Sequence, residues 1–472
     1  MSQSHRQSPR WFSFVAALML LIPLFAAAGN ARALAQDASP AASPVVPEMA
    51  VNTEVSGEID VAMVGNGQMV TLSELLPEFN KIYPNITVNF TIVPENEVRQ
   101  IITQDISNQG EQFDVVTIGT FEVPLWAESG WLTEVGETAA ADETYALDDI
   151  FPAHISGLSY QDGLYGLPFY GESSMMFYRT DVFEAAGITM PERPTWDQIA
   201  EYARAVHNPA EDLSGICLRG LPGWGQQLAP LTTVINAFGG RWYDEEWNAQ
   251  LSSPESTAAI DFYLNLLADA GEPAPEQAGF TECQTLFNQG QVAMWYDATS
   301  AAELLSDPTL SDFADQVGYA YAPTQVGNTN WLWNWAFAMA STTDAPEAAS
   351  AFMMWATSSQ YQETVAALRG WGQAPTGARV STYENPSYLE FAGDFAAIVQ
   401  ESIQTANPNE PTVNPVPYTG GQFVRIVEFQ ELGNQVSQEF AAAMTGALTI
   451  EEAIANANEL ANTTAEQGGY QT

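Results

Sequence analysis

The sequence predicts an α/β protein with two domains, and three observations support this prediction. Short apolar runs alternate with amphipathic helical patterns in the first folded segment, an order typical of a parallel sheet with helices on both faces. About 400 residues follow the N-terminal segments, which is more than one hydrophobic core usually organises. The sequence also contains no internal repeat.

The N-terminal segment differs in composition from the rest of the chain. Residues 1–35 contain no Asp or Glu, and two Arg residues precede the apolar run Trp11–Ala28, which small residues follow at Ala33-Leu34-Ala35. This layout predicts a secretory signal peptide over residues 1–35. An uncleaved membrane anchor is the alternative, because the apolar run is about as long as a bilayer is thick. No Cys lies near the cleavage site, so we do not expect a lipoprotein.

The folded part follows an Ala/Ser/Pro-rich stretch, residues 36–56, which we expect to be a flexible linker. Hydrophobic periodicity then predicts, in order, a strand over 58–64, a helix that starts at Thr71 with Glu74 in a capping box, a strand over 86–92, a helix over 95–109 and a strand over 113–118. Further capping boxes predict helices that begin after Thr195 and Thr449. The proline-rich segment Asn407–Pro417 is predicted to lie at the surface.

Two loops at the ends of predicted strands are candidate ligand contacts. Parallel sheets bind ligands beyond the carboxyl ends of their strands. In this chain those ends carry Gly65-Asn66-Gly67-Gln68 and Gly119-Thr120-Phe121-Glu122. Both loops combine glycine, which lets the backbone approach a ligand closely, with side chains that form hydrogen bonds. Ordinary turn chemistry is the alternative for either loop.

The charge of the chain excludes one class of partner. The sequence holds 58 Asp and Glu against 13 Lys and Arg, which gives a formal net charge of −45. Such a surface repels phosphate backbones and anionic lipids, so we expect no nucleic-acid binding. Because the acidic residues are spread along the chain without a long block, they indicate a solvated surface rather than a cation site.

Sequence signatures of catalysis are scarce. After the predicted signal peptide only His154 and His207 remain, which excludes a multi-histidine metal centre, and we expect both to be structural. The chain contains no G-x-S-x-G elbow, P-loop or G-x-G-x-x-G fingerprint. A glycosidase-type pair of carboxylates stays open, because so many acids make any one pair uninformative. We therefore predict no catalytic residues, no metal and no cofactor.

The aromatic and cysteine residues are more informative. Trp331-Leu332-Trp333-Asn334-Trp335 would place three indoles on one side of a strand. Sugar and polyol binding needs flat apolar faces together with fixed polar groups. Packing between the two domains is the alternative for this cluster. Cys217 and Cys283 are the only cysteines, and in an exported protein a disulfide is favoured over two buried thiols.

Several segments resemble the extracellular solute-binding proteins of bacterial ABC importers. Gly215–Trp247, which contains CLRGLPGWG and FGGRW, is similar to the middle of the sorbitol/mannitol-binding branch. The other similar segments are Phe113–Leu132, Gly163–Asp181, Gly290–Thr299 (with MWYDAT), Asn330–Phe337 (with WLWNW), Gly370–Pro375 and Pro417–Gly433. The resemblance covers nearly all of residues 57–463.

The resemblance implies a two-lobe periplasmic-binding-protein fold, or Venus-flytrap fold, with a ligand cleft between two α/β lobes. We expect one lobe to comprise residues 57–168 and 336–358, and the other to comprise residues 169–335 and 359–463. Residues 464–472 are then a C-terminal tail.

The resemblance also implies ligand-binding residues, by their positions in the matching segments. Glu172, Arg219 and Asp297 are expected to form hydrogen bonds with hydroxyl groups, and charged partners strengthen such bonds. Trp331 or Trp333, together with Trp371, is expected to pack on a carbon chain. The complete set is Gln68, Thr120, Glu122, Glu172, Arg219, Trp224, Asp297, Trp331, Trp333, Asn334 and Trp371.

The function implied by the resemblance is that of the non-catalytic, substrate-binding component of an ABC importer. Such a protein binds an acyclic polyol such as sorbitol or mannitol by hinge closure, and delivers it to membrane permease subunits. We expect an exported monomer, either periplasmic or at the cell surface. A mono- or disaccharide ligand in the same role is the closest alternative, and a secreted glycoside-processing enzyme is an alternative from another class.

Overall fold

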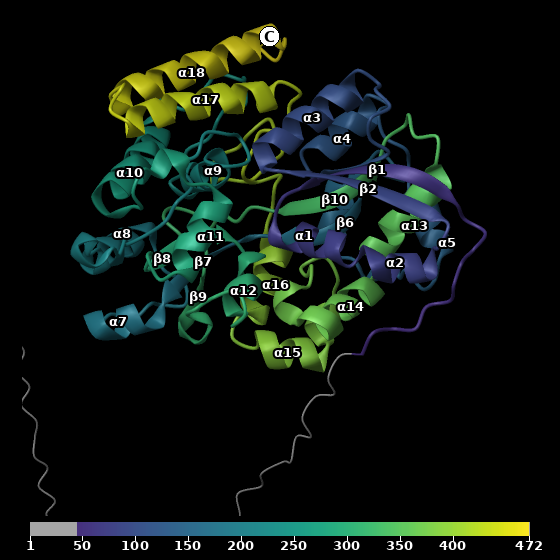
Figure 1. The fold of residues 1–472 in the computed structure, drawn as a ribbon. Coiled ribbons are helices and arrows are strands. Elements are labelled where there is room, and N and C mark those ends of the chain that lie inside the picture. The colour runs from purple at the N-terminus through teal and green to yellow at the C-terminus, as the bar shows by residue number, and fades with distance from the viewer. Residues whose placement is uncertain (1–44, 472) are drawn as a thin grey trace, which may run out of the picture. The chain divides into compact units, whose positions relative to one another are not determined.

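The computed structural model describes residues 45–471, which form two lobes, each built on its own β-sheet (Figure 1). The predicted signal peptide lies outside the described residues. The first sheet has the strand order β2-β1-β3-β10-β6, and the second has the order β8-β7-β9. The strands of the first sheet are β1 (Gly57–Val64), β2 (Ile86–Val93), β3 (Val115–Ile118), β6 (Leu167–Glu172) and β10 (Trp333–Met339).

The first lobe is partly parallel, as the alternation of strands and helices predicts. β1 runs parallel to β2 and β3, whereas β10 runs antiparallel to its neighbours β3 and β6. The core lies on this sheet, where Val61 and Met63 of β1 have no exposed surface. The helices of this part are α1 (Gly67–Glu74), α2 (Leu76–Ile82), α3 (Glu95–Ser107), α4 (Glu122–Glu128), α5 (Gly136–Ala141), α6 (Pro152–Gly157) and α13 (Pro346–Ala356), and a small hairpin joins β4 (Ser159–Tyr160) to β5 (Gly163–Leu164).

The three predicted strands and the helix over 95–109 are confirmed, but the first predicted helix is wrong in its start. Helix α1 begins at Gly67, because the side chain of Asn66 accepts a hydrogen bond from the backbone of Met69 and caps the helix. Thr71 therefore lies inside α1, and Glu74 is its last residue. A second helix starts directly afterwards, with Pro77 in its first turn, where a missing backbone N–H is tolerated.

The second lobe contains an antiparallel sheet, which the sequence reading did not predict. β7 (Ser174–Arg179) pairs antiparallel with β8 (Met294–Ala298) on one side and with β9 (Val317–Tyr321) on the other. Its helices and those that follow in the chain are α7 (Thr180–Ala186), α8 (Trp196–Val206), α9 (Leu228–Ala237), α10 (Pro254–Ala270), α11 (Phe280–Asn288), α12 (Ala301–Ser306), α14 (Ser359–Arg369), α15 (Pro386–Ala392), α16 (Ala396–Thr405), α17 (Phe429–Met444) and α18 (Ile450–Gln467). The capping boxes at Thr195 and Thr449 are confirmed.

The chain passes between the sheets in two extended segments. β6 ends at Glu172 in the first sheet and β7 begins at Ser174 in the second, so the first passage is at Ser173. The chain returns after β9 and re-enters the first sheet as β10. The predicted lobe boundaries after residues 168 and 335 lie inside β6 and β10, a few residues from these passages.

The segments at the two ends of the described chain contact the folded part. The backbone of Asn52, in the predicted linker, donates to the carbonyl of Ile82, and Thr53 accepts from Asn85. The predicted C-terminal tail begins inside α18, and Tyr470 stacks on Trp247 with 4.5 Å between ring centroids. Within residues 45–471 no helix is both long enough and apolar enough to span a membrane.

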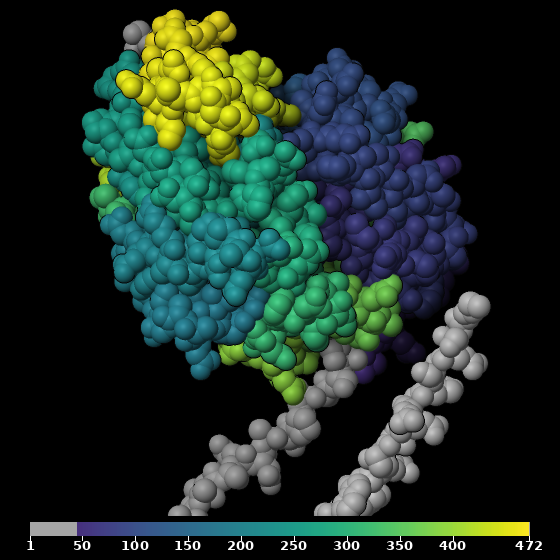
Figure 2. All heavy atoms as spheres, turned by 60° about the vertical axis from the view of Figure 1, so that its left-hand side comes forward, coloured from purple at the N-terminus to yellow at the C-terminus, as the bar shows by residue number. Residues whose placement is uncertain are grey.

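Figure 2 shows the lobes as neighbouring bodies, with the purple and blue N-terminal segments on one side and the teal segments on the other. Helices α17 and α18 pack on each other and on α10, so the C-terminal helices belong with the second lobe. The predicted surface segment Asn407–Pro417 contains no helix or strand and is mostly exposed, although Pro411 and Thr412 are buried.

Candidate ligand-binding site

A cavity of about 250 Å³ lies where the two lobes meet. The carboxyl end of β1, helix α3, the passages between the sheets and the second-lobe segment around Arg219 all contribute to its wall. The polar and aromatic side chains of the wall include Asn66, Glu95, Asn96, Arg99, Tyr170, Glu172, Arg219, Trp224, Gln226, Phe280, Glu282, Ser300, Trp331, Trp333, Trp335 and Gln422. The cavity therefore combines indole faces with charged and amide groups.

Arg219 is held rigidly from within the second lobe. Cys217, two residues before Arg219, forms a parallel β-bridge with Trp295 of β8. This pairing brings Arg219 beside Asp297. The guanidinium donates to both carboxylate oxygens of Asp297, with Nε 2.8 Å from Oδ2, and Nη1 donates to the carbonyl of Gly225 at 2.9 Å. Asp297 also accepts from the indole of Trp295 at 2.9 Å. Burial lowers the pKa of Arg219, but the charge of Asp297, its hydrogen bonds and the charges of Glu95 and Glu172 together raise it by more, so the guanidinium stays charged.

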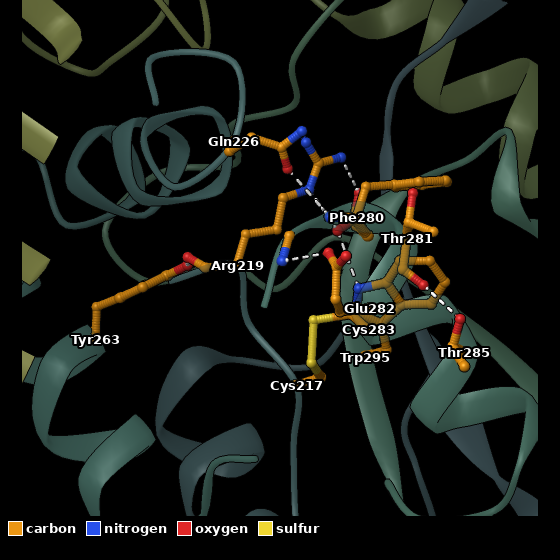
Figure 3. The surroundings of a disulfide bond; sticks show 12 residues. Cys217, Arg219, Gln226, Tyr263, Phe280, Thr281, Glu282, Cys283, Thr285 and Trp295 are labelled. Atoms are coloured by element: carbon orange, nitrogen blue, oxygen red, sulfur yellow. Dashed lines mark hydrogen bonds and ion pairs between the residues drawn. A yellow bond between two sulfur atoms is a disulfide. The ribbon is translucent and has the colours of Figure 1, made fainter. Parts of the chain in front are cut away.

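The disulfide between Cys217 and Cys283 lies beside this cluster (Figure 3). It joins the segment that leads into Arg219 to helix α11, whose first turn contributes Phe280 to the cavity wall. The Cα atoms of the two cysteines are 5.7 Å apart. Among the described residues, the one group of side chains spaced as metal ligands is Cys217, Cys283 and Glu272, and its two sulfur atoms are bonded to each other.

Arg99 faces the cavity from helix α3 of the first lobe. Its Nε donates to Glu95, one helical turn earlier, at 3.0 Å, and its Nη1 donates to Glu122 of α4 at 2.5 Å. Its guanidinium carbon lies 4.1 Å from the ring centroid of Trp224 and 4.7 Å from that of Trp335. Because Trp224 comes from the second lobe, this cation–π contact spans the two lobes.

Hydrogen bonds also cross from one lobe to the other around the cavity. Gln226 donates to Glu95 at 2.9 Å, and Asn96 donates to the carbonyl of Pro222 at 3.0 Å. Gly225 permits this close approach, because a Cβ atom at that position would lie 2.2 Å from a carboxylate oxygen of Glu95. The glycines of the PGWG segment therefore serve the contact between the lobes.

Some buried polar atoms in the wall have no partner. The indole nitrogens of Trp224 and Trp331 and the amide oxygen of Gln422 form no hydrogen bond with any described residue. Buried polar groups are usually satisfied, so such atoms mark positions where a ligand can form hydrogen bonds. Two donors and one acceptor are thus available to hydroxyl groups.

Glu172 is a buried carboxylate of the wall with unused bonding capacity. It ends β6, and one of its oxygens accepts from Ser300 at 2.6 Å. Burial raises the pKa of Glu172 to about 7, although the bond from Ser300 and the charge of Arg219 act in the opposite direction. Its carboxyl group can therefore accept hydrogen bonds when ionised and donate one when protonated.

The structure brings five of the predicted ligand-binding residues to the cavity wall: Glu172, Arg219, Trp224, Trp331 and Trp333. Glu122 and Asp297 lie directly behind the wall, where each pairs with one of the two arginines. Gln68 donates to the carbonyl of Ser300 at 3.3 Å, and Thr120 donates to the carbonyl of Leu332 at 3.5 Å. Neither of these two residues lines the cavity.

Asn334 and Trp371 also lie away from the wall. Asn334 is fully buried in β10, one position after Trp333 and therefore on the other face of the strand. Trp371 packs against Tyr388 and donates to Ser387 at 3.0 Å. It borders a separate hollow that Ser359, Asn385 and Pro386 also line, so it has no carbon chain to pack on in this cavity.

Sequence reasoning missed several wall residues, and Arg99 is the most informative of them. It is one of only 13 basic residues in a strongly acidic chain, and it sits one helical turn after Glu95. A rare cation paired at helical spacing near a strand end is a signal that could have been used. Tyr170, Gln226 and Ser300 offer no comparable signal, because their place in the wall depends on how the lobes meet.

The three indoles of the 331–335 cluster all line the cavity, but their faces are shared with protein cations. Arg99 lies over Trp333 and Trp335, and Arg219 lies 5.9 Å from the ring centroid of Trp331. The cluster therefore does both things that the sequence left open: it lines the cavity, and it packs against protein side chains where the lobes meet.

Comparison with known proteins agrees with this architecture. Residues 65–363 match the bacterial extracellular solute-binding protein family. The chain is 42% identical over 414 residues to the mannitol-binding protein of Pseudomonas aeruginosa, an alignment that covers 87% of this chain and 94% of that protein.

Solved structures give the same result for the fold. An ABC transporter solute-binding protein from Agrobacterium vitis S4, solved with bound D-mannitol, is 42% identical, with a TM-score of 0.86 over 88% of this chain and 100% of that one. One from Agrobacterium radiobacter K84, in complex with ribitol, is 21% identical with a TM-score of 0.77 over 87% of this chain and 100% of that one, and supports the fold alone. The predicted two-lobe fold is confirmed, and the chain belongs to the family of bacterial extracellular solute-binding proteins.

Proposed function

We propose that this protein binds an acyclic polyol, such as D-mannitol or D-sorbitol, in the cavity between its lobes. The observation that carries the proposal is the wall itself. Two arginines, the carboxylate of Glu172 and three unpartnered polar atoms surround about 250 Å³ of space beside four indoles. A polyol carries one hydroxyl on each carbon and no charge. Its binding site therefore needs many hydrogen-bonding groups. The 42% identity to a mannitol-binding protein supports the same ligand class.

Each wall group has a distinct part in this binding. Arg219, fixed by Asp297, presents its remaining N–H groups as donors, and Glu172 acts as an acceptor. The indole nitrogens of Trp224 and Trp331 donate to hydroxyl groups, while their rings pack on C–H groups. Asp297 and Glu122 act through the arginines, so they position the donors without touching the ligand. Trp371 borders a different hollow, so it is left out of this site.

Binding proceeds by closure of the two lobes around the ligand. We propose that residues 57–168 and 336–358 form one lobe and that residues 169–335 and 359–463 form the other, with the passages at β6 and β10 as the hinge. The contacts from Gln226 to Glu95 and from Trp224 to Arg99 are made only when the lobes are together. A ligand that touches both walls therefore favours the closed state.

The role of the protein follows from binding without conversion. We infer that the chain is not an enzyme and that it acts as an exported monomer, in the periplasm or at the cell surface. The closed form then delivers the polyol to the membrane permease subunits of an ABC importer. The same cavity with a cyclic sugar as ligand is the alternative that the test below separates.

The test is thermal melting of the purified protein with D-mannitol, D-sorbitol, ribitol, xylitol, glucose and maltose. A ligand at 100 times its dissociation constant stabilises the folded state by about 2.7 kcal/mol, so the melting temperature rises. We expect one or two hexitols to raise it and the cyclic sugars to leave it unchanged. Stabilisation by glucose or maltose alone would overturn the ligand class. Recovery of unchanged ligand after prolonged incubation checks the absence of catalysis.

A further inference from the structure

The cavity wall carries an excess of negative charge. Glu95, Glu172 and Glu282 line it, and Glu122 and Asp297 stand directly behind it, each bonded to an arginine of the wall. The cations of this group are Arg99 and Arg219 alone. Five carboxyl groups therefore face two guanidinium groups within one enclosed site.

Three of the five carboxylates have both oxygens committed to protein donors, and a fourth, Glu282, has one. Glu95 accepts from Arg99 with one oxygen and from Gln226 with the other. Glu122 accepts from Arg99 and from the backbone of Gly119. Asp297 accepts from both arms of Arg219 and from Trp295. Glu282 accepts from the backbone of Gly279 at the start of α11.

Glu172 is the one buried carboxylate of the five with an unused oxygen: its Oε1 atom accepts no hydrogen bond from any described residue, while Oε2 accepts only from Ser300. Glu282 also keeps an unused oxygen, but its side chain is exposed to solvent. The residue is 7% exposed and lines the cavity. The charge of Arg219 acts on Glu172, but this guanidinium is already paired with Asp297 through two hydrogen bonds. A half-free carboxylate in a negatively charged, enclosed cavity is a site for an ammonium group.

We propose that the cavity prefers a cationic amino-polyol, in which an ammonium group replaces one terminal hydroxyl, over the neutral polyol, and excludes the corresponding sugar acid. The proposal rests on the proposed polyol function and specifies its ligand class. The ammonium donates to Glu172, while the remaining hydroxyls use the contacts of the neutral ligand. A carboxylate in the same place brings a sixth negative group into the enclosed site without a free cation to pair with.

The preference depends on pH through the groups that surround Glu172. These are Ser300 as donor, Arg219, Asp297 and Glu95 as charges, and Tyr170 on the same strand. Burial raises the pKa of Glu172 to about 7, so the carboxyl group is ionised at pH 8 and protonated at pH 5.5. An alkylamine stays protonated at both pH values, because its pKa is about 10. The cavity should therefore prefer the amine over the neutral polyol at pH 8 and lose this preference at pH 5.5.

The test is isothermal titration calorimetry with D-mannitol, 1-amino-1-deoxy-D-mannitol and D-mannonate at pH 8 and pH 5.5. The three probes share one carbon chain and carry charges of zero, plus one and minus one. D-Mannitol has two equivalent ends, so a single substituted end does not change which hydroxyls the protein can reach. At pH 8 we expect the amine to bind about tenfold more tightly than mannitol, a gain of about 1.4 kcal/mol, and mannonate at least a hundredfold more weakly. At pH 5.5 the amine and mannitol should bind within about threefold of each other.

Glu172→Gln supplies the matched variant, read as the ratio of the amine and mannitol affinities at pH 8, which should fall to about one. Glu303→Gln is its control, because Glu303 is also buried with a pKa raised to about 7 but bonds to Thr376 and Tyr388 away from the cavity. In the Glu303→Gln variant the tenfold ratio should remain.

An amine that binds no better than mannitol at pH 8, or mannonate that binds equally well, overturns this inference and leaves the polyol function standing. Binding by none of the three probes, together with no rise in melting temperature from any polyol of the melting test, overturns the polyol function itself. If Glu172→Gln does not fold, the pH dependence of the native protein decides.

Discussion

Two buried arginines face the same cavity from opposite lobes, and their surroundings differ in a way that separates binding from closure. Every hydrogen-bonding partner of Arg219 belongs to the second lobe: Asp297 and the carbonyl of Gly225. Arg99 takes its carboxylates, Glu95 and Glu122, from the first lobe but rests on Trp224 from the second. The Arg219 cluster is therefore complete within one lobe, whereas the Arg99 cluster is complete only when the lobes meet.

One side of the cavity is therefore complete before the ligand arrives, and the other is completed around the ligand. A preformed cluster contributes to the stability of its lobe whether or not ligand is present. A cluster that spans two lobes contributes to the affinity, because the energy of its contacts is gained on closure. Substitutions in the two clusters should consequently affect different measurements.

The largest expected effect comes from breaking the Arg219 pair. Asp297→Asn leaves a buried guanidinium without its carboxylate, and loss of one partner of such a pair costs about 3–5 kcal/mol of unfolding free energy. We expect this loss in denaturant unfolding of the ligand-free protein. Glu122→Gln is the matched change in the other cluster and should cost clearly less, because Arg99 keeps Glu95. Equal losses in the two variants would contradict the distinction between the clusters.

Removal of the disulfide tests the same rigidity by another route. The bridge closes a sequence separation of 66 residues next to Arg219, and loss of a disulfide of this kind costs about 2–4 kcal/mol. The double variant Cys217→Ser, Cys283→Ser should lower the melting temperature of the ligand-free protein. Reduction of the native protein should reproduce the shift, and reduction of the double variant should have no effect. A variant that melts at the native temperature would show that the second lobe is rigid without the bridge.

The two clusters also differ in how far the sequence predicts them. Arg219 and Asp297 belong to the segments CLRGLPGWG and MWYDAT, so the resemblance identifies both, but it assigns Asp297 to the ligand although the residue serves Arg219. Arg99 lies on a helix whose limits are well predicted by hydrophobic periodicity. The sequence around it, however, does not show that this polar side chain contacts Trp224. Contacts between lobes depend on their relative placement, which local patterns do not encode.

The fold shows the same division between local and non-local information. Strands β1, β2 and β3 follow from apolar periodicity, because each is a short buried run between clear turn signals. The antiparallel pairing of β7 with β8 and β9 joins residues far apart in the chain, and no local pattern specifies it. Trp371 shows where a resemblance misleads. Its segment resembles the polyol-binding branch as the cavity segments do, but the residue lies at a different hollow.

A substitution in the Arg99 cluster should lower the affinity for the ligand without a comparable loss of stability. Trp224→Ala removes an indole that faces the cavity and supports Arg99 across the lobes, so we expect the best-bound polyol to lose about 2 kcal/mol of binding free energy. Calorimetric titration measures this as a roughly thirtyfold weaker dissociation constant. Trp371→Ala is the control, because Trp371 is a buried indole outside the cavity wall, and it should leave the affinity within about twofold. The reverse order of effects would restore Trp371 to the site and remove Trp224 from it.

The smallest expected effect is a pH dependence that comes from three buried carboxyl groups. Burial raises the pKa of Glu172 and of Glu303 to about 7, and that of Glu272, which lies beside the disulfide, to about 8. A carboxyl group whose pKa is raised on folding stabilises the folded state below its unfolded pKa, and this contribution is lost as pH rises through the folded value. The melting temperature of the ligand-free protein should therefore fall between pH 6 and pH 8.5, where exposed carboxylates are already ionised. Glu272→Gln should remove part of the fall, on the order of 1 kcal/mol, because an amide at this buried position does not ionise. A melting temperature that rises across this range would mean that these carboxyl groups are ionised in the folded state at lower pH, and that the fold solvates them better than their burial indicates.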